Sequence, residues 1–404
     1  MPVANSDLIR AINRFNILNT IRISGAISRV EIAEITGQSR ASVTNITARL
    51  IDEGLIYEKR TEDSAVRGRR RVLLAMNPDA AYVVGVKLSA SRISCAVTDM
   101  QAEVRSSVNL PVRTAKRPVA FMADLIEEAV RHCVEAAKLD LHGISGIGIG
   151  VPGFVNSLTG TCYWTPLYQQ GDIHLKQLVE SRLGVDTFIE NDTNTVTLAH
   201  QWFGEGRGIN HFLVITIEDG VGMGIVVNGQ LYRGASGFAA EFGHMVVNDS
   251  GPPCRCGKRG CLEAYVSDFS ILAEAQRAAA SGAWPRSPAG NLDYEDVLSL
   301  AQSGDTVLAS IFDKAGRYLG EGLSALIQIF NPAKIIISGD GVKAGDLMFA
   351  GMREVLSKQT NPAHHRATKI VIQKWRDTDW ARGAASLVLQ ELYRSPFNRV
   401  RPVI

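Results

Sequence analysis

The sequence predicts an α/β protein that begins with a winged helix-turn-helix. Between residues 1 and 78, apolar residues recur at helical spacing and two short strand-like segments follow them, which is typical of a winged helix. Beyond that segment, apolar strands alternate with amphipathic helices, which indicates a sheet with helices packed on it. Because 404 residues exceed one ordinary core, we expect further domains, an α/β lobe at 79–198 and a second at 199–404.

The first domain divides into three helices and a β-wing. Apolar spacing predicts a helix over 8–21, a Ser-x-x-Glu capping box opens a second helix over 28–37, and a third covers 39–54. Strand-like segments at 55–58 and 72–75 flank a polar wing. A bare three-helix packing unit is the alternative, but the short turn before the third helix and its polar outer face favour DNA binding.

The expected DNA contacts lie on the third helix and on the wing. The N-terminal end of that helix would enter the major groove, where base edges and phosphates are within reach. An arginine-rich run in the wing would enter an A·T-rich minor groove, whose negative potential attracts guanidinium groups. A solvated linker is the alternative for this run. The predicted DNA-contacting residues are Ser39, Arg40, Ser42, Thr44, Asn45, Arg49, Arg67, Gly68, Arg69 and Arg70.

Bulk properties narrow the class of protein. The net charge is only +2, so a nucleic-acid contact must come from local basic clusters and not from a generally basic surface. The start of the chain lacks the apolar core of a signal peptide, and no stretch reaches the roughly 18 apolar residues that cross a bilayer. We therefore expect a cytoplasmic protein without membrane contact and without structural disulfides.

The remaining chain alternates strands and helices. We expect strands at 82–88, 92–99, 144–151, 211–217, 224–228 and 334–338, and helices at 119–138, 193–203, 266–282 and 305–330. A glycine-rich turn would connect the strands that flank residue 220.

Three cysteines and one histidine crowd together in a glycine-rich segment. Three thiolates and one imidazole form a tetrahedral donor set that suits Zn²⁺, and four protein ligands leave no open position, so the metal would be structural. Free thiols in a mobile loop are the alternative. The predicted ligands are His244, Cys254, Cys256 and Cys261. The scattered Cys95, Cys133 and Cys162 have apolar neighbours and are expected to be small buried side chains.

This motif resembles that of a known family. Glu-x-Gly-His at 241–244, followed by Cys-x-Cys-Gly-x-x-Gly-Cys-x-Glu at 254–263, resembles the metal motif of the ROK family, which contains bacterial sugar repressors and sugar kinases. The resemblance extends from about residue 80 to the end of the chain. It implies a two-lobed actin-like (ribonuclease-H-like) sugar-kinase fold whose C-terminal helix returns to the first lobe. A winged helix in front is the arrangement of the family's repressors.

The resemblance also implies a set of sugar contacts. Residues that match the family's sugar-contacting positions are Gly153, Asn191, Asp192, Glu241, His244 and Glu263. Carboxylates and amides suit this task because sugar hydroxyls both donate and accept hydrogen bonds. His244 would bind the metal through one ring nitrogen and the sugar through the other. Read without the family, Asp192 would be the N-cap of a helix, and Glu263 an ordinary carboxylate at a helix start.

The chain departs from the family's kinases at the first phosphate loop. Kinase members carry Asp-x-Gly-Gly-Thr there, whereas residues 87–91 read Lys-Leu-Ser-Ala-Ser, so backbone amides lose the close approach that glycines permit. Glycine-rich turns at 219–224 and 338–341 are kept, but such turns also have plain structural uses. We therefore expect no enzyme activity and no catalytic residue.

These patterns and the resemblance together predict a DNA-binding transcriptional repressor. Its expected effector is a monosaccharide or a sugar phosphate, its target a double-stranded DNA operator, and its assembly a homodimer or homotetramer. An active ATP-dependent sugar kinase with a DNA-binding domain is one alternative. A repressor controlled by a protein partner is the other.

Overall fold

The computed structural model describes residues 6–60, 72–89, 91–112, 118–167, 171–284, 292–374 and 377–393. The chain forms two compact units, of which the first comprises Met1–Gly208 with Asp377–Ile404 and the second comprises Ile209–Arg376. Across the described ranges, no helix combines the length and the hydropathy that crossing a membrane requires.

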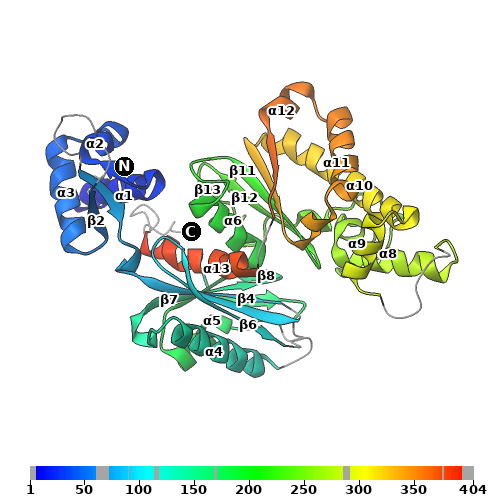
Figure 1. Ribbon diagram of the computed structural model, residues 1–404, viewed down its shortest axis with the longest axis horizontal. Coiled ribbons are helices and arrows are strands. Elements are labelled where there is room, and N and C mark those ends of the chain that lie inside the picture. Colours follow the sequence, from blue (N-terminus) through cyan, green and yellow to red (C-terminus); the bar gives the residue numbers. More distant parts are fainter. Residues whose placement is uncertain are drawn as a thin grey trace. The chain divides into compact units, whose positions relative to one another are not determined.

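The first unit begins with a winged helix (Figure 1). Its elements are α1 (Ser6–Ser24), β1 (Ile27–Ser28), α2 (Arg29–Thr36), α3 (Arg40–Asp52), β2 (Ile56–Arg60) and β3 (Val72–Met76). Ser28 and Glu31 form the predicted capping box of α2, and Gly37 ends that helix in the left-handed region. The strand order is β1-β3-β2, so the predicted strand pair is joined by a short third strand that the sequence pattern did not indicate.

The rest of the first unit is an α/β lobe. Its elements are η1 (Pro78–Ala80), β4 (Tyr82–Leu88), β5 (Arg92–Thr98), β6 (Val104–Pro111), α4 (Val119–Ala136), η2 (Leu141–Gly143), β7 (Ile144–Val151), β8 (Phe154–Asn156), β9 (Thr161–Trp164), α5 (Leu175–Leu183), β10 (Thr187–Asn191), α6 (Asp192–Phe203) and α13 (Asp377–Leu392). The main sheet has the order β10-β7-β4-β5-β6. In Figure 1, α13 lies on one face of this sheet and α4 with α5 on the other, while α6 packs against α13.

The second unit repeats this topology. Its elements are β11 (Phe212–Ile217), β12 (Val221–Val227), β13 (Gln230–Leu231), η3 (Phe242–His244), α7 (Glu263–Val266), α8 (Asp268–Ala280), α9 (Tyr294–Gln302), α10 (Thr306–Phe330), β14 (Lys334–Ser338), η4 (Asp340–Ala344), α11 (Asp346–Gln359), α12 (Pro362–Ala367) and β15 (Lys369–Ile372). The strand order of its sheet is β13-β12-β11-β14-β15. When the strands of each sheet are numbered by their order in the chain, both sheets have the order 3-2-1-4-5. In both sheets three strands run antiparallel and two more add in parallel, which confirms the predicted actin-like fold.

Two predicted elements differ from the structure. The helix expected over 266–282 is α8, which begins two residues later because the Ser267 hydroxyl caps it by accepting a hydrogen bond from the Ser270 backbone N–H, whereas Val266 ends the separate helix α7. The glycine-rich segment expected to be a turn up to Gly224 is mostly strand, since Gly222 and Gly224 pair with β11 inside β12. Only residues 218–220 remain as the turn.

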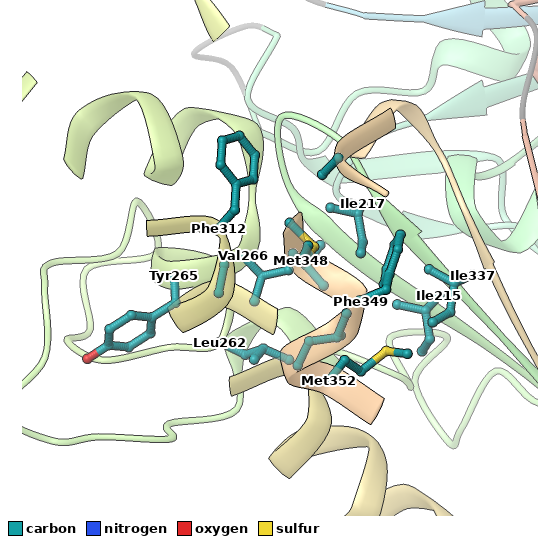
Figure 2. Close-up of a cluster of buried hydrophobic side chains, with 14 of the residues drawn as sticks. Ile215, Ile217, Leu262, Tyr265, Val266, Phe312, Ile337, Met348, Phe349 and Met352 are labelled. Atoms are coloured by element: carbon teal, nitrogen blue, oxygen red, sulfur yellow. The ribbon is translucent and has the colours of Figure 1, made fainter. Parts of the chain in front are cut away.

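The core of the second unit holds the segment that carries the predicted metal ligands. Figure 2 shows Leu262, which immediately precedes α7, and Tyr265 and Val266 of α7 in one cluster with Phe312 of α10 and the methionines of α11. Leu262, Val266 and Phe312 are fully buried. Each such side chain contributes about 1.5–3 kcal/mol by leaving water. This burial anchors the chain immediately after the last predicted metal ligand.

The predicted boundary between residues 198 and 199 falls inside α6, and the chain enters the second unit only after Gly208. The reason is packing, because α6 belongs with α13 and β7 in the first unit. The winged helix also shares a core with the end of α6 and with α13. That shared core includes Ile17, Ile21, Leu74, Val83, Trp202, Val388, Leu389 and Tyr393.

Candidate functional site

The N-terminal half of α3 presents a polar surface. Ser39, Arg40, Thr44 and Asn45 are exposed, as is Arg49 one turn further on. The opposite face is apolar, and Val43 and Leu50 are fully buried in the winged-helix core. The structure therefore places this set of predicted DNA-contacting residues on one accessible face of one helix.

Several of these side chains form hydrogen bonds that stabilise the start of α3. The Ser39 hydroxyl accepts a hydrogen bond from the Ser42 backbone N–H and caps α3. The Thr44 hydroxyl donates to the Arg40 carbonyl oxygen at 2.8 Å, and the half-buried Ser42 donates to Gln38. The remaining predicted DNA contacts, Arg67, Gly68, Arg69 and Arg70, lie outside the described residues.

The predicted metal ligands converge in the second unit. The candidate ligand atoms of His244, Cys254, Cys256 and Cys261 all lie within 4.8 Å of one another. His244 Nδ1 is 3.6 Å from Cys254 Sγ, and Cys256 Sγ is 3.7 Å from Cys261 Sγ. A tetrahedron with metal–sulfur bonds of about 2.3 Å has edges of about 3.8 Å. The cluster has the donor types and the spacing to bind a tetrahedral metal ion.

Backbone contacts shape the loop that carries these ligands. Cys254 N–H donates to the Lys258 carbonyl oxygen at 2.8 Å, and Val246 pairs with Cys261 in an isolated bridge. Gly260 has a φ of 65°, and a Cβ there would lie 1.4 Å from the Asn248 carbonyl oxygen. Only glycine fits this close approach, so the glycine before the last cysteine is required by the loop geometry.

The first unit brings three of the predicted sugar contacts together. Asn191 Nδ2 donates to the Gly153 carbonyl oxygen at 3.1 Å, and Asn191 Oδ1 accepts from the Asn194 backbone. The N-cap of α6 is therefore Asn191, and the interpretation of Asp192 as that cap is wrong. Asp192 is the first helical residue, where a carboxylate is favoured by the helix dipole.

Lys87, in the segment where the family's kinases carry their first phosphate loop, faces the same region. Lys87 is almost completely buried, and its ammonium lies 3.2 Å from the centroid of the Trp380 ring in α13. Burial raises the pKa of Asp192, and the charge of Lys87 opposes that rise. The chain thus supplies an internal cation near Asp192. Sequence reasoning identified Lys87 only as a lost aspartate, and nothing in the sequence signalled Trp380.

The other three predicted sugar contacts lie in the second unit. Glu241 is exposed and precedes η3, which carries His244 with Nδ1 toward the cysteines. Glu263 opens α7, and its Oε2 accepts a hydrogen bond from the Val221 backbone N–H at 3.2 Å. Its other oxygen, Oε1, lies 3.6 Å from Cys254 Sγ. Glu263 therefore links the loop that carries the candidate metal ligands to the strand that follows the glycine-rich turn.

A second link between these two segments was not predicted. Arg255, between two of the cysteines, forms a two-pronged ion pair with Asp219, with N–O distances of 2.7 and 2.8 Å. Its guanidinium also stacks over Phe269 at 3.7 Å. The only sequence signal was the position of Arg255 inside the cysteine motif.

Carboxyl groups gather beside the same turn. Burial, and after it the charges of Glu218 and Asp340, raise the pKa of Asp268 to about 7. The Asp268 backbone N–H also donates to the Glu218 carbonyl oxygen at 2.9 Å, which ties α8 to the turn. This negative charge is unfavourable for a bound phosphate chain.

The raised pKa of Asp268 predicts a pH-dependent stability. Because the folded pKa exceeds the unfolded value of 3.8, the folded state binds the extra proton, and its stability should fall as pH rises from about 4 to 7. Asp268→Asn should remove this slope and stabilise the protein at pH 8 by about 2 kcal/mol. Urea unfolding at several pH values measures it. The exposed Glu321 provides the control Glu321→Gln, and equal slopes in both variants would contradict the prediction.

Family models match nearly the whole chain. The model described as "ROK family" covers residues 83–391, and the model described as "MarR family" covers residues 6–70. A xylose repressor of Caldicellulosiruptor bescii is 29% identical over 401 residues, covering 98% of this chain and 99% of that protein. The DNA-binding transcriptional dual regulator NagC of Escherichia coli K12 is 27% identical over 386 residues, covering 96% and 94%.

Solved structures agree with these matches. A ROK family transcriptional regulator, described as a homologue of the E. coli MLC protein, superposes with a TM-score of 0.80 at 28% identity, covering 96% of this chain and 97% of that chain. A ROK family glucokinase from Streptomyces griseus, solved with glucose and AMPPNP, superposes with a TM-score of 0.66 at 28% identity, covering 76% and 99%. With a MarR-type winged helix in front of this matched domain, the chain belongs to the ROK family.

Proposed function

We propose that this chain is a sugar-responsive, DNA-binding transcriptional repressor of carbohydrate-metabolism genes. The observation that carries the proposal is that a winged helix with an exposed polar α3 and the pair Asn191-Asp192 belong to one compact unit with a shared core. A change at the pair therefore has a continuous packed route to the DNA-binding helices. The relatives named as repressors or regulators support the same function.

The proposed effector is a monosaccharide or a sugar phosphate. Its hydroxyls would be held by Gly153, Asn191, Asp192, Glu241, His244 and Glu263. His244 supports this assignment because Nδ1 faces the cysteines, which leaves Nε2 for the sugar. The ion that best fits the three thiolates and the imidazole is a structural Zn²⁺, which would fix the orientation of His244 and, through the loop, of Glu263.

We propose that the chain has no kinase activity. A kinase must hold metal and phosphate charge in place with close backbone amides and cations. Here Lys87 and Trp380 occupy the start of the first loop, and Asp219 at the second turn is paired with Arg255. The carboxylates of Glu218 and Asp340 add negative charge there, which contributes to the raised pKa of Asp268. An active kinase remains the rival that ATP turnover would support.

The proposed DNA partner is a double-stranded operator read by a homodimer or homotetramer. Two winged helices related by a two-fold axis would contact two half-sites, so a modest change in their spacing alters affinity. The exposed residues of α3 and the arginine run of the wing are the proposed contacts. Control by a protein partner is the alternative to control by a sugar.

A thermal-shift screen tests the function. The wild-type protein is heated with common monosaccharides, their phosphates, and separately ATP. One sugar should raise the melting temperature as its concentration increases. At ~100 times its Kd, the bound sugar should stabilise the folded state by about 2.7 kcal/mol. Asp192→Asn should lose this shift, because the half-buried Asp192 carboxylate is a proposed partner of a sugar hydroxyl. Asp186→Asn, at an exposed site before β10, should keep it.

The sugar that binds is then added to complexes with duplexes selected from a random pool. Release of the duplex by wild type and its retention by Asp192→Asn would support the repressor. ATP-dependent phosphorylation of the sugar would establish the kinase. No shift with any sugar would overturn sugar control and favour a protein partner.

A further inference from the structure

A half-exposed tryptophan projects from the hairpin beside the proposed sugar contacts. The hairpin consists of β8 and β9, and Trp164 ends β9 with 47% of its surface exposed. Its ring lies 5.5 Å from the ring of Phe154, tilted by 43°. Exposed tryptophans are uncommon on protein surfaces because their large apolar area favours burial, so such a ring at a polar site points to a ligand.

Gly153 connects this tryptophan to the polar contacts. The carbonyl oxygen of Gly153 accepts from Asn191 Nδ2 at 3.1 Å. On its other side, Gly153 has a φ of 110°, and a Cβ there would lie 2.2 Å from the Trp164 carbonyl oxygen. The Trp164 backbone therefore packs directly on the residue that Asn191 holds. Asn191 and the Trp164 backbone thus contact the same glycine from two sides, and Asp192 directly follows Asn191 in the chain.

The backbone on either side of Trp164 is fixed. Cys162, two residues earlier, is buried and exchanges two backbone hydrogen bonds with Ile173, at 2.8 and 2.9 Å. Thr165, the next residue, is 2% exposed, and its hydroxyl accepts from the Leu167 backbone. The tryptophan is thus presented on a rigid support although its ring is half exposed. A preorganised ring loses little conformational entropy when a ligand covers it.

The chemistry of a pyranose fits this pairing of groups. Its hydroxyls lie around the ring edge and need donors and acceptors, whereas one face presents C–H groups with little polarity. An aromatic ring with a negative face attracts such C–H groups and excludes water from them. We propose that Trp164, backed by Phe154, is the stacking platform for the apolar face of the effector sugar. This inference rests on the proposed function and adds a residue outside the family's set of contacts.

Titration calorimetry on the full chain tests the platform. The probes are D-xylose, D-glucose and N-acetyl-D-glucosamine, each measured with wild type and variants. Trp164→Ala should weaken binding about tenfold, whereas Trp164→Phe keeps a ring and should stay within about threefold. Tyr163→Ala is the matched control, because neighbouring strand residues face opposite sides of the hairpin and Tyr163 is 40% exposed. It should bind sugar as wild type does.

Tryptophan fluorescence supplies a second readout. A sugar over the indole should change the emission of wild type, and Trp164→Phe should lose most of that change while still binding. If wild type binds a sugar and Trp164→Ala binds it equally, the platform is overturned and the proposed function stands. If wild type binds none of these three sugars and no sugar or sugar phosphate in the thermal-shift screen, sugar control fails and the platform fails with it.

Discussion

Replacing Cys261 by serine is expected to abolish metal binding at the proposed site in the second unit and to lower the unfolding temperature by about 10 °C or more. Cys261 is fully buried, and its sulfur lies 3.7 Å from Cys256 Sγ. A serine hydroxyl is a poor ligand for the ion that three thiolates prefer. The loss should be large because binding at a closed structural site contributes several kcal/mol to folding. Metal analysis by mass spectrometry and thermal unfolding measure both effects.

The control for this experiment is Cys95→Ser in the first unit. Cys95 is also buried but lies outside the cluster of candidate ligands, so this variant should retain one zinc ion per chain. Any loss of stability in Cys95→Ser measures the effect of replacing a buried thiol that is not a candidate metal ligand. A wild-type protein purified without zinc, or a Cys261→Ser variant that retains it, would contradict the proposed metal site.

The sequence predicted most helices and strands because their signals are local. The capping box at Ser28 and the alternation of apolar strands with helices depend on residues close together in the chain. The boundary inside α6 was wrong because it depends on α13, which lies almost two hundred residues later in the sequence. Long-range packing of this kind leaves no periodic signal in the segment concerned.

The candidate site also contains residues that local sequence signals predicted and residues whose roles depend on long-range folding. The cluster of candidate metal ligands was predicted because cysteine and histidine are rare and these four are closely spaced in the sequence, and the structure gathers all four. The roles of Lys87 and Arg255 could not be predicted, because each depends on a partner brought near by folding, Trp380 for the lysine and Asp219 for the arginine. A basic residue alone does not indicate its partner.

The second large effect concerns the junction between the winged helix and the first lobe. Trp202, at the end of α6, is only 8% exposed and packs with Tyr393 after α13, at 5.3 Å between ring centroids. Arg22, in the last turn of α1, stacks on the Trp202 ring at 4.0 Å and donates to its carbonyl oxygen. Burial lowers the pKa of Arg22 to about 10, so the guanidinium still carries its charge at neutral pH.

Trp202→Ala should therefore destabilise the protein by about 3–5 kcal/mol. The substitution leaves a cavity in the shared core and removes the ring that covers a buried guanidinium, so both the hydrophobic and the cation–π contribution disappear. The midpoint of urea unfolding, followed by circular dichroism, measures the loss. Affinity for a selected DNA duplex should fall as well, because α1 would no longer be held against α6 and α13.

Trp164→Ala is the matched control, since it deletes the same side chain where it is 47% exposed. It should cost less than about 1 kcal/mol and leave DNA affinity unchanged. Equal unfolding midpoints for the two variants would show that Trp202 does not hold the junction. If Trp202→Ala unfolds early but binds DNA as wild type does, the winged helix keeps its binding geometry without this core. The proposed route from Asp192 through α6 to the DNA-binding helices would then have to run elsewhere.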